Sequence, residues 1–388
     1  MKQLPIKRSI FTRCFGNNLL SRLVAKTSVR SVKTFSAALA LVLIAGCSSI
    51  SYYSQIVSGH LRIVMGKRPL AEIVSDETVN DSIKHRLNVA QRAREYAIGQ
   101  LGLPNNQSYT SFYDTGKDYV TWNVVAAEEF SFEPKTWCFP IAGCVSYRGY
   151  YAESDADKYA EELKEEGVDT AVIGATAYST LGWFKDPLLS TMLERSDPGI
   201  AALIFHELAH QQLYVGDDST FNESFASFVE REGLRLWLEK EALSNPQENQ
   251  EEINAELSAR KSRRDDFVAL LTSTRDDLEV LYASDIDTES MRQKKSQRFE
   301  QMRSEYAELK ASWNDYPGYD HWFSSELNNA RLVSVATYNE YVPAFEVLFQ
   351  QSGQSFKEFY TAAQELSDMP ADERTAVMEQ LLASVSSQ

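Results

Sequence analysis

The sequence lacks any apolar run of the ~20 residues that a membrane-spanning helix requires. The apolar run nearest the N-terminus, Phe35 to Gly46, has only 12 residues, which is too short for a comfortable span. No internal repeat is present. Apolar residues make up 43% of the 388 positions, so the chain can bury a hydrophobic core and form one large domain or two ordinary ones.

Acidic residues are absent from positions 1–46, which contain eight lysines and arginines. A basic segment followed by a short apolar run is typical of a secretory signal peptide. The run ends in "IAGC", which resembles the lipobox of bacterial lipoproteins. That resemblance implies cleavage before Cys47, lipid on the Cys47 thiol and, because Ser48 follows, anchoring in the outer membrane with the protein facing the periplasm. An uncleaved anchor is the alternative.

Basic residues are scarce in the remainder of the chain. The formal net charge is −16, from 39 basic and 55 acidic residues. Removing the eight basic residues of positions 1–46 leaves 31 minus 55, a net charge of −24. Phosphate binding needs a basic surface, so we do not expect a nucleic-acid partner.

Only four cysteines occur, and Cys14 and Cys47 lie in or next to the signal segment. Cys138 and Cys144 remain, in "WCFPIAGCVSY". In an oxidising periplasm this pair favours a disulfide that closes a small loop. Two free thiols or a metal pair are the alternatives, although the pair by itself lacks the further ligands of a structural zinc site.

Histidine is also rare, yet two of the five histidines stand four residues apart in "HELAH". On a helix, His206 and His210 lie on one face, with Cβ atoms about 5 to 6 Å apart, where two imidazoles can bind one Zn²⁺. Glu207 lies beside them and is suited to accept a proton from water. Two exposed histidines on an amphipathic helix are the alternative.

A catalytic zinc site needs a third protein ligand. Glu223 begins the next apolar-periodic run, after a spacer of twelve residues following His210. We expect a short return between two helices to bring its carboxylate to the metal. Glu230 is the rival ligand and is expected instead to form an ion pair or to hold a ligand in place. Ser227, one turn after Glu223, is also expected to support the ligands without binding the metal.

The segment "HELAHQ…FNESFASFVE" resembles the signature of gluzincin metallopeptidases, and particularly of aminopeptidase N. This resemblance implies His206, His210 and Glu223 as zinc ligands and Glu207 as general base. The spacer is shorter than in aminopeptidase N, so the chain is not expected to belong to that family itself. The lipobox and most of the remaining chain resemble a family of bacterial lipoproteins described as predicted aminopeptidases.

The expected fold is α+β and mainly α, with a zincin-like arrangement. A small mixed or antiparallel sheet is expected to pack on the HELAH helix, and two helices to end the chain. Residues 47–74 are expected to form a lipidated tether, and residues 75–388 one metallopeptidase domain. Within it, residues 244–310 are highly charged and predict a solvated helical arm that contributes no core.

The oxyanion that forms during peptide hydrolysis needs a hydrogen-bond donor besides the metal. Tyr338 is the first candidate and Tyr178 the second, followed by Tyr147 and His321. Asn329 and Arg331 are further candidates, in their case for binding the substrate backbone. Aminopeptidase N relatives also hold the substrate amine with an acidic residue upstream of HExxH, whereas residues 174–180 contain no acid and are expected to offer an edge strand to a peptide.

These features together predict a membrane-tethered zinc peptidase that acts on a peptide substrate by attack of water. A non-catalytic envelope lipoprotein that binds peptides or a partner on a peptidase-like fold is the alternative. Hydrolysis of a cell-wall amide is a third reading. An intact Glu207 favours an enzyme, because a binding module has no need of a general base.

Overall fold

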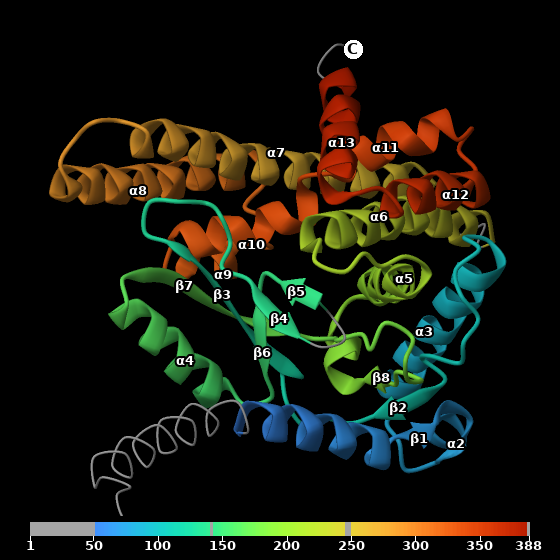
Figure 1. Ribbon diagram of the computed structural model, residues 1–388. Helices are drawn as coiled ribbons and strands as arrows, with labels where there is room; N and C mark the ends of the chain where they lie inside the picture. Colours follow the sequence, from blue (N-terminus) through green and yellow to red (C-terminus); the bar gives the residue numbers. More distant parts are fainter. Residues whose placement is uncertain (1–50, 140–142, 245–249, 386–388) are drawn as a thin grey trace, which may run out of the picture. The chain divides into compact units, whose positions relative to one another are not determined.

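The computed structural model describes residues 51–139, 143–244 and 250–385 (Figure 1). Ile56–Gln388 form one compact unit, and the described residues 51–55 belong to a separate unit. The predicted signal segment and Cys47 lie outside the described residues. Within the described residues, no helix has both the length and the apolar character needed to cross a membrane.

The described chain is mainly helical with a small content of strand, as predicted. The segment expected to be a tether differs from that prediction, because from Ile56 onward it belongs to the compact unit. Residues 51–66 are helical, and Ile63, Leu70 and Ile73 are buried in the core. After this helix come β1 (Arg68–Pro69), α2 (Leu70–Ser75) and α3 (Asp81–Gly99).

Three small sheets replace the single sheet that was expected. The largest is antiparallel with the order β6-β3-β7, and the second has the order β1-β2-β8 with β2 and β8 parallel. β4 and β5 form a separate hairpin. The strands are β2 (Ser111–Tyr113), β3 (Thr121–Glu128), β4 (Trp137–Phe139), β5 (Gly143–Val145), β6 (Arg148–Tyr150), β7 (Val168–Ala175) and β8 (Leu188–Leu189).

The sheet β6-β3-β7 packs mainly against α4 (Glu153–Glu165) and α10 (Asn329–Asn339). The HELAH helix α5 (Asp197–Gln212) follows the short 3-10 helix η1 (Ser190–Glu194) and packs mainly against α3 and α6 (Ser219–Ser244). The expected packing of the main sheet on the HELAH helix is therefore replaced by helix-on-helix packing, because α5 is apolar on most of its surface and needs cover on several sides.

The described part of this charged arm forms two long helices, α7 (Gln250–Tyr282) and α8 (Thr288–Ser312), which pack on each other. The prediction that this arm contributes no core was wrong. Its apolar residues recur every three or four positions and gather on one face, where they meet β3, β7 and α10. The arm residues of this second core are Phe267, Leu270, Leu271, Leu278, Phe299, Met302 and Tyr306.

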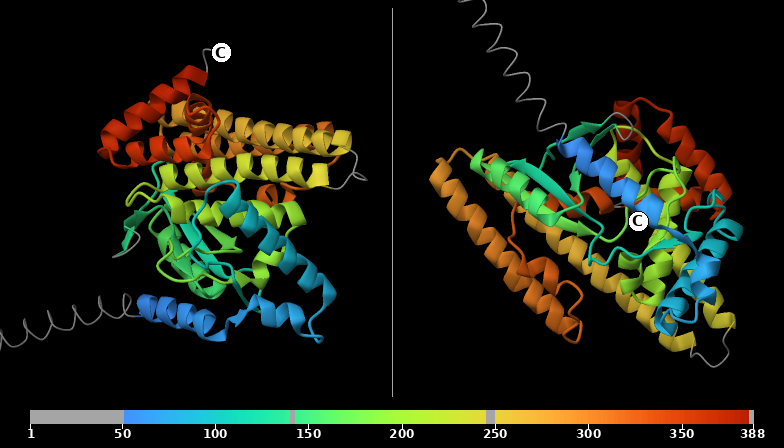
Figure 2. Two further views of the ribbon diagram at one scale, coloured as in Figure 1. Left: turned by 90° about the vertical axis from the view of Figure 1, so that its right-hand side faces the viewer. Right: turned by 90° about the horizontal axis from the view of Figure 1, so that it is seen from below.

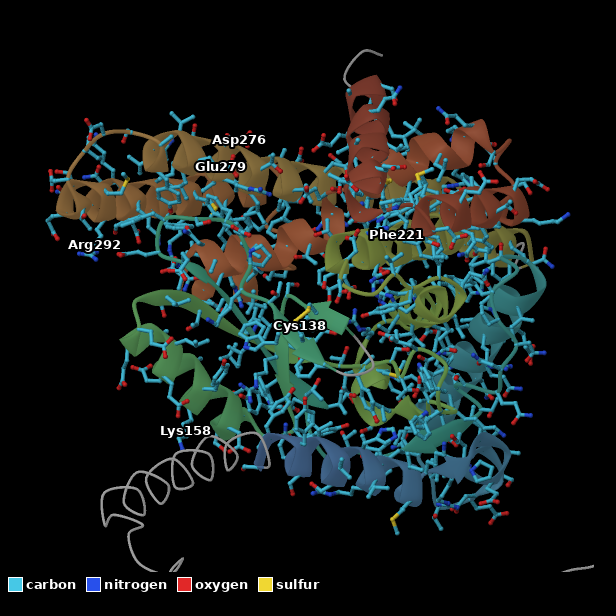
Figure 3. All side chains as sticks on the ribbon, in the orientation of Figure 1. Cys138, Lys158, Phe221, Asp276, Glu279 and Arg292 are labelled. Atoms are coloured by element: carbon cyan, nitrogen blue, oxygen red, sulfur yellow. A yellow bond between two sulfur atoms is a disulfide. The ribbon has the colours of Figure 1, made fainter. Side chains whose placement is uncertain are left out.

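The last three helices, α11 (Val342–Gln351), α12 (Phe356–Ser367) and α13 (Ala371–Val385), complete the first core, which also contains α3, α5 and α6. The short helix α9 (Asp320–Ser324) and α10 contribute to the second core. Phe221 of α6, labelled in Figure 3, packs edge-to-face on Phe345 of α11, with ring centroids 5.1 Å apart. Phe225 of α6 stacks on Phe359 of α12 at 5.7 Å. These aromatic contacts hold α6, and with it Glu223, against the end of the chain.

Candidate metal centre

Helix α5 presents His206, Glu207 and His210, and all three side chains are buried. The hydroxyl of Ser196 accepts a hydrogen bond from the Gly199 amide and caps the helix, and Pro198 occupies its first turn. Asp197 is the first residue of the helix and not its cap. Because neighbouring helices cover α5, its imidazoles have fixed orientations and little access to solvent.

The connection between α5 and α6 is closed by Asn222, one residue before Glu223. The Asn222 side chain accepts a hydrogen bond from the Val215 amide at 2.8 Å and donates one to the Val215 carbonyl at 2.7 Å. A buried amide that both donates and accepts fixes the loop more firmly than a single contact does. The position of Glu223 relative to α5 is therefore set by its own neighbour in the sequence.

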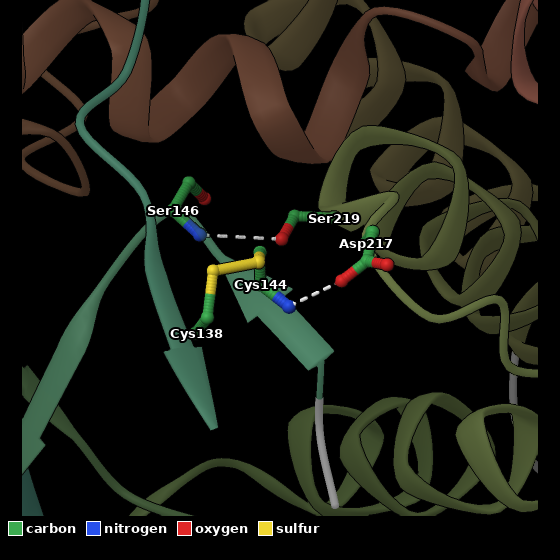
Figure 4. The surroundings of a disulfide bond; sticks show 5 residues. All are labelled: Cys138, Cys144, Ser146, Asp217 and Ser219. Carbon is green, nitrogen blue, oxygen red and sulfur yellow. Dashed lines mark hydrogen bonds between the residues drawn. A yellow bond between two sulfur atoms is a disulfide. The ribbon is translucent and has the colours of Figure 1, made fainter. Parts of the chain in front are cut away.

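The disulfide hairpin supports the same connection from outside (Figure 4). Cys138 and Cys144 form a disulfide between β4 and β5. The Cys144 amide donates to Asp217 Oδ1 at 2.5 Å, and the Ser146 amide donates to Ser219 Oγ at 3.3 Å. The hairpin is thereby bound to the loop that separates His210 from Glu223.

Three ligand atoms converge between α5 and α6. His206 Nε2 lies 3.1 Å from His210 Nε2, and Glu223 Oε2 lies 3.4 Å from each of these nitrogens. Glu223 Oε2 is buried. Around a tetrahedral Zn²⁺ with ligand distances of ~2.0 to 2.1 Å, neighbouring ligand atoms are about 3.3 Å apart. The spacing of the three atoms therefore fits a zinc ion without rearrangement.

Glu230 approaches His206 from the opposite side of the ring. Its Oε2 atom lies 3.1 Å from His206 Nδ1. A proton on Nδ1 donated to this carboxylate leaves the Nε2 lone pair directed at the other two ligand atoms. Glu230 is thus placed to orient a ligand and is not itself in the group of three. Ser227 is buried beside it on α6.

The charges in the site are strongly coupled. Burial lowers the pKa of His206, but hydrogen bonds to Glu223 and Glu230 outweigh burial and raise that pKa to about 10. Burial raises the pKa of Glu223, but the charges and hydrogen bonds of His210 and His206 outweigh burial and lower it to about 2. The two carboxylates therefore hold a positive charge between them, as a cation-binding site requires.

Glu207 lies outside the group of three ligand atoms. Its surroundings act on the pKa of its carboxyl in opposite directions. Burial raises the pKa of its carboxyl, while the charges of His206 and His210 lower it. The net direction is upward, and a raised pKa makes the ionised carboxylate a better proton acceptor. This residue has the burial and the neighbours of a proton-transfer group.

The two candidate tyrosines differ in their surroundings. The Tyr338 ring stacks on the His206 ring, with centroids 6.1 Å apart and 22° between the planes, and it remains 40% exposed. The Glu223 charge, with burial, raises the pKa of the Tyr338 phenol. The Tyr178 hydroxyl instead lies 3.0 Å from His60 Nδ1, and its ring contacts Tyr151. The structure brings Tyr338, but not Tyr178, to the three ligands.

The remaining candidates for oxyanion or substrate binding also differ in whether they lie near the three ligand atoms. Tyr147 is close enough for its phenol to raise the pKa of Tyr338. His321 is exposed on α9. Asn329 is fully buried and donates to three carbonyls of the segment after β3, and Arg331 is buried and donates to Ser325. The last two therefore hold the fold together and are not available to a substrate.

The sequence matches the model of the family described as "Putative aminopeptidase" over residues 51–378. This match covers most of the chain. The chain belongs to this aminopeptidase family. Membership indicates a peptidase and agrees with the family expected from the sequence. Comparisons with curated proteins and with solved structures found no match.

Two supporting residues of this aminopeptidase-family chain were missed in the sequence. Neither Asn222 nor Asp217 is among the candidate site residues predicted from the sequence. Asn222 could have been identified from its position directly before a candidate ligand, because a buried amide there can close a tight connection. No sequence signal pointed to Asp217, since its partner in the disulfide hairpin lies 73 residues away.

Proposed function

We propose that the protein is a zinc-dependent peptidase of the gluzincin type, with His206, His210 and Glu223 as the metal ligands. The observation that carries this proposal is the triangle of ligand atoms with sides of 3.1, 3.4 and 3.4 Å. Two imidazoles and one carboxylate are a donor set typical of catalytic zinc, and three protein ligands leave a position for water. A zincin-like fold is part of the same proposal.

Zinc bound at this site would act as a Lewis acid, which would polarise the scissile carbonyl and lower the pKa of water. The carboxylate of Glu207 accepts the proton that the attacking water loses, and the same carboxyl then delivers it to the leaving amine. Glu230 keeps His206 in the required tautomer. The phenol of Tyr338, whose pKa is raised, stays protonated and can donate a hydrogen bond to the developing oxyanion.

A peptide substrate has an edge strand available for alignment. β7 is at one edge of its sheet, paired with β3 alone. The Thr170 carbonyl points away from β3, since it accepts a hydrogen bond from Asn328. Because alternate residues of a strand face the same edge, Val172 and Gly174 also direct their amides and carbonyls outward. An extended peptide can add to this edge through main-chain hydrogen bonds.

The location proposed for this enzyme is the bacterial envelope, with a lipid anchor on Cys47 and the catalytic unit in the periplasm. The "IAGC" motif and the basic, acid-free segment before it support this location. The disulfide between Cys138 and Cys144 agrees with an oxidising compartment.

Replacing Glu207 with Gln tests the proposal. We expect zinc to remain bound and peptide hydrolysis to fall by about 10²- to 10⁴-fold, as is typical when a general base is removed. Glu194→Gln is the matched control, because Glu194 is exposed and does not approach the ligands. Metal content and the cleavage of peptides with free and blocked N-termini are measured together.

Unchanged turnover in Glu207→Gln would exclude Glu207 as the base. Cleavage of blocked peptides alone would show an endopeptidase, which residues 174–180 allow because they contain no acid to hold a free amine. Zinc bound at the site without cleavage of any peptide would instead support a peptide-binding lipoprotein.

A further inference from the structure

A row of exposed apolar side chains follows one face of helix 56–66. Val57, Leu61 and Met65 are 55%, 49% and 82% exposed and stand four residues apart. Residues spaced by four lie one above another on a helix. Large apolar side chains in a continuous exposed row, unlike scattered ones, mark a surface that contacts something apolar.

This helix is held firmly on the compact unit, so its outer face is well defined. A Cβ atom added at Gly59 would lie 2.3 Å from the Tyr151 ring, and one added at Gly66 would lie 2.5 Å from the Tyr113 ring. The two glycines therefore allow close contact on the inner face, where Ile63 is also buried. The exposed row cannot turn inward without breaking these contacts.

A second exposed apolar group stands beside the helix. Trp183 and Phe184 are 71% and 55% exposed, at the tip of the loop between β7 and β8. The loop is a defined turn, because the Trp183 amide donates to the Thr180 carbonyl and the Phe184 amide donates to the Thr180 hydroxyl. The ring of Phe184 lies 5.0 Å from the ring of His60, which joins the loop to helix 56–66.

The charge around these side chains differs from that of the whole molecule. Residues 51–71 contain Arg62, Lys67 and Arg68 and no acid, although the chain has a formal net charge of −16. Lys185 follows Phe184 and is exposed, and its carbonyl accepts a hydrogen bond from Lys67 Nζ at 2.6 Å. Of these basic residues, Arg68 is paired with an acid, Asp76. A basic border around an apolar surface complements anionic lipid headgroups.

We propose that Val57, Leu61, Met65, Trp183 and Phe184 form a membrane-contact surface that rests on an anionic bilayer. The proposal builds on the envelope location proposed above, since Val57 follows Cys47 by only ten residues. Exposed tryptophan is favoured at the interface between lipid headgroups and acyl chains, and the lysines and arginines bind the headgroups. The lipid on Cys47 and this surface together provide the two signals that stable membrane attachment needs.

The surface gives the catalytic unit one orientation on the membrane. Figures 1 and 2 show helix 56–66 on the opposite side of the compact unit from α7 and α8. Val280 of α7 is 74% exposed and apolar, but it lies on that far side. It therefore provides a control position that should never touch lipid.

The test reconstitutes the full chain in phosphatidylethanolamine and phosphatidylglycerol vesicles that contain a brominated lipid, which quenches nearby tryptophan. The emission of Trp183 is obtained as the difference between the wild type and Trp183→Phe. We expect it to lose most of its intensity in brominated vesicles and to shift to shorter wavelength. Tryptophan at the control position, in Val280→Trp, should keep its intensity.

Leu61→Ser combined with Met65→Ser should restore the Trp183 emission, and so should neutral phosphatidylcholine vesicles, although less completely. Trp183 emission that is insensitive to brominated lipid, or equal quenching at Val280→Trp, would overturn the proposal. Self-association of the chain through Leu61 and Met65 in detergent, without quenching in vesicles, would point to a second copy as the occupant and would also overturn it.

Two measurements on the same preparation separate this proposal from the proposed function. Mass spectrometry shows whether Cys47 carries lipid, and peptide hydrolysis reports on the metal centre. A lipidated, active chain without quenching contradicts the membrane-contact surface alone. Quenching in a chain that lacks lipid supports this surface and contradicts the proposed lipid anchor. Quenching in a chain that lacks activity supports this surface and contradicts the peptidase proposal.

Discussion

Helix α8 is longer than helix α5, with 25 residues against 16, but it buries a much smaller share of its surface. In α5 nearly every residue from Gly199 to His210 is buried, so charged groups are held in a dry environment with fixed neighbours. In α8 only five positions are buried, at intervals of three or four residues, and the charges face solvent. Charge is useful for chemistry in the first helix and mainly keeps the second soluble.

The ion pairs of the two regions differ in the same way. Arg275 and Glu279 of α7 are partly exposed and 2.8 Å apart, a type of pair that contributes little to stability. Lys295 of α8 is the exception in the arm, since it is buried and its Nζ atom lies 2.6 Å from Asp169 and from the Glu129 carbonyl. Burial, and not the number of charges, therefore decides where electrostatics matter.

The largest effect is expected for a substitution of a buried residue in α5. His210→Ala removes one of three ligands, so bound zinc and peptidase activity should both be lost, by more than the roughly 10- to 100-fold that follows loss of a supporting partner. Metal analysis of the purified chain and a peptide assay measure this. His85→Ala is the control, because His85 is an exposed histidine paired with Asp197 on α5. Retention of zinc would contradict the ligand set.

Lys295→Ala should lower the stability of the second core without removing the metal. It leaves Asp169 without its charged partner, although the Asn329 amide still donates to it. Because the Asp169 side chain is 17% exposed, the cost should be below the about 3 to 5 kcal/mol of unfolding free energy that is typical of breaking a fully buried pair. Urea denaturation measures the loss, with Lys294→Ala as control, since Lys294 is exposed on the same turn of α8. Equal losses in the two variants would show that the buried pair has no special role.

Glu230→Gln should have an intermediate effect, on metal affinity. The amide can still accept a hydrogen bond from His206 Nδ1 but no longer carries the charge that raises the basicity of the ring. Zinc affinity should fall about 10- to 100-fold. Competition with a chelator measures it, and Glu232→Gln serves as control, because Glu232 pairs with Arg235 instead. An unchanged affinity would mean that Glu230 does not support His206.

Arg292→Ala should cause the smallest change in unfolding free energy. Arg292, labelled in Figure 3, contacts Glu129 at 2.6 and 2.9 Å and lowers the pKa of that carboxyl. A lowered folded pKa stabilises the fold above the ordinary carboxyl pKa, and this contribution disappears as the pH falls through the lowered value. The difference between variant and wild type should therefore be present at neutral pH and vanish in acid. A difference that grows in acid would contradict it.

Part of the candidate site follows from local sequence. The spacing of His206 and His210 places both imidazoles on one face of any helix that contains them, and the capped, apolar segment around them makes a helix the expected structure. The residue types at positions 206, 210 and 223 also narrow the metal to one that takes nitrogen and oxygen ligands. These inferences need only the periodicity of a helix and the chemistry of side chains.

Other parts required contacts between segments far apart in the chain. The sequence ranked Tyr338 ahead of Tyr178, but the contact between the Tyr338 and His206 rings depends on how α10 crosses α6, which no local pattern encodes. The core within the charged arm was missed because many charged residues separate its apolar residues in the sequence. The apolar face is evident only in the fold, where β3, β7 and α10 cover it.

By itself, the sequence determined the two histidines, Glu207 beside them and the helix that carries them, because an α-helix repeats over a few residues. Only the tertiary structure decided that Glu223 Oε2 stands 3.4 Å from both imidazoles. That distance depends on a loop held by Asn222 and by Asp217 with the disulfide hairpin. Contacts of this kind arise from the packing of whole elements, so they become visible only when the fold is known.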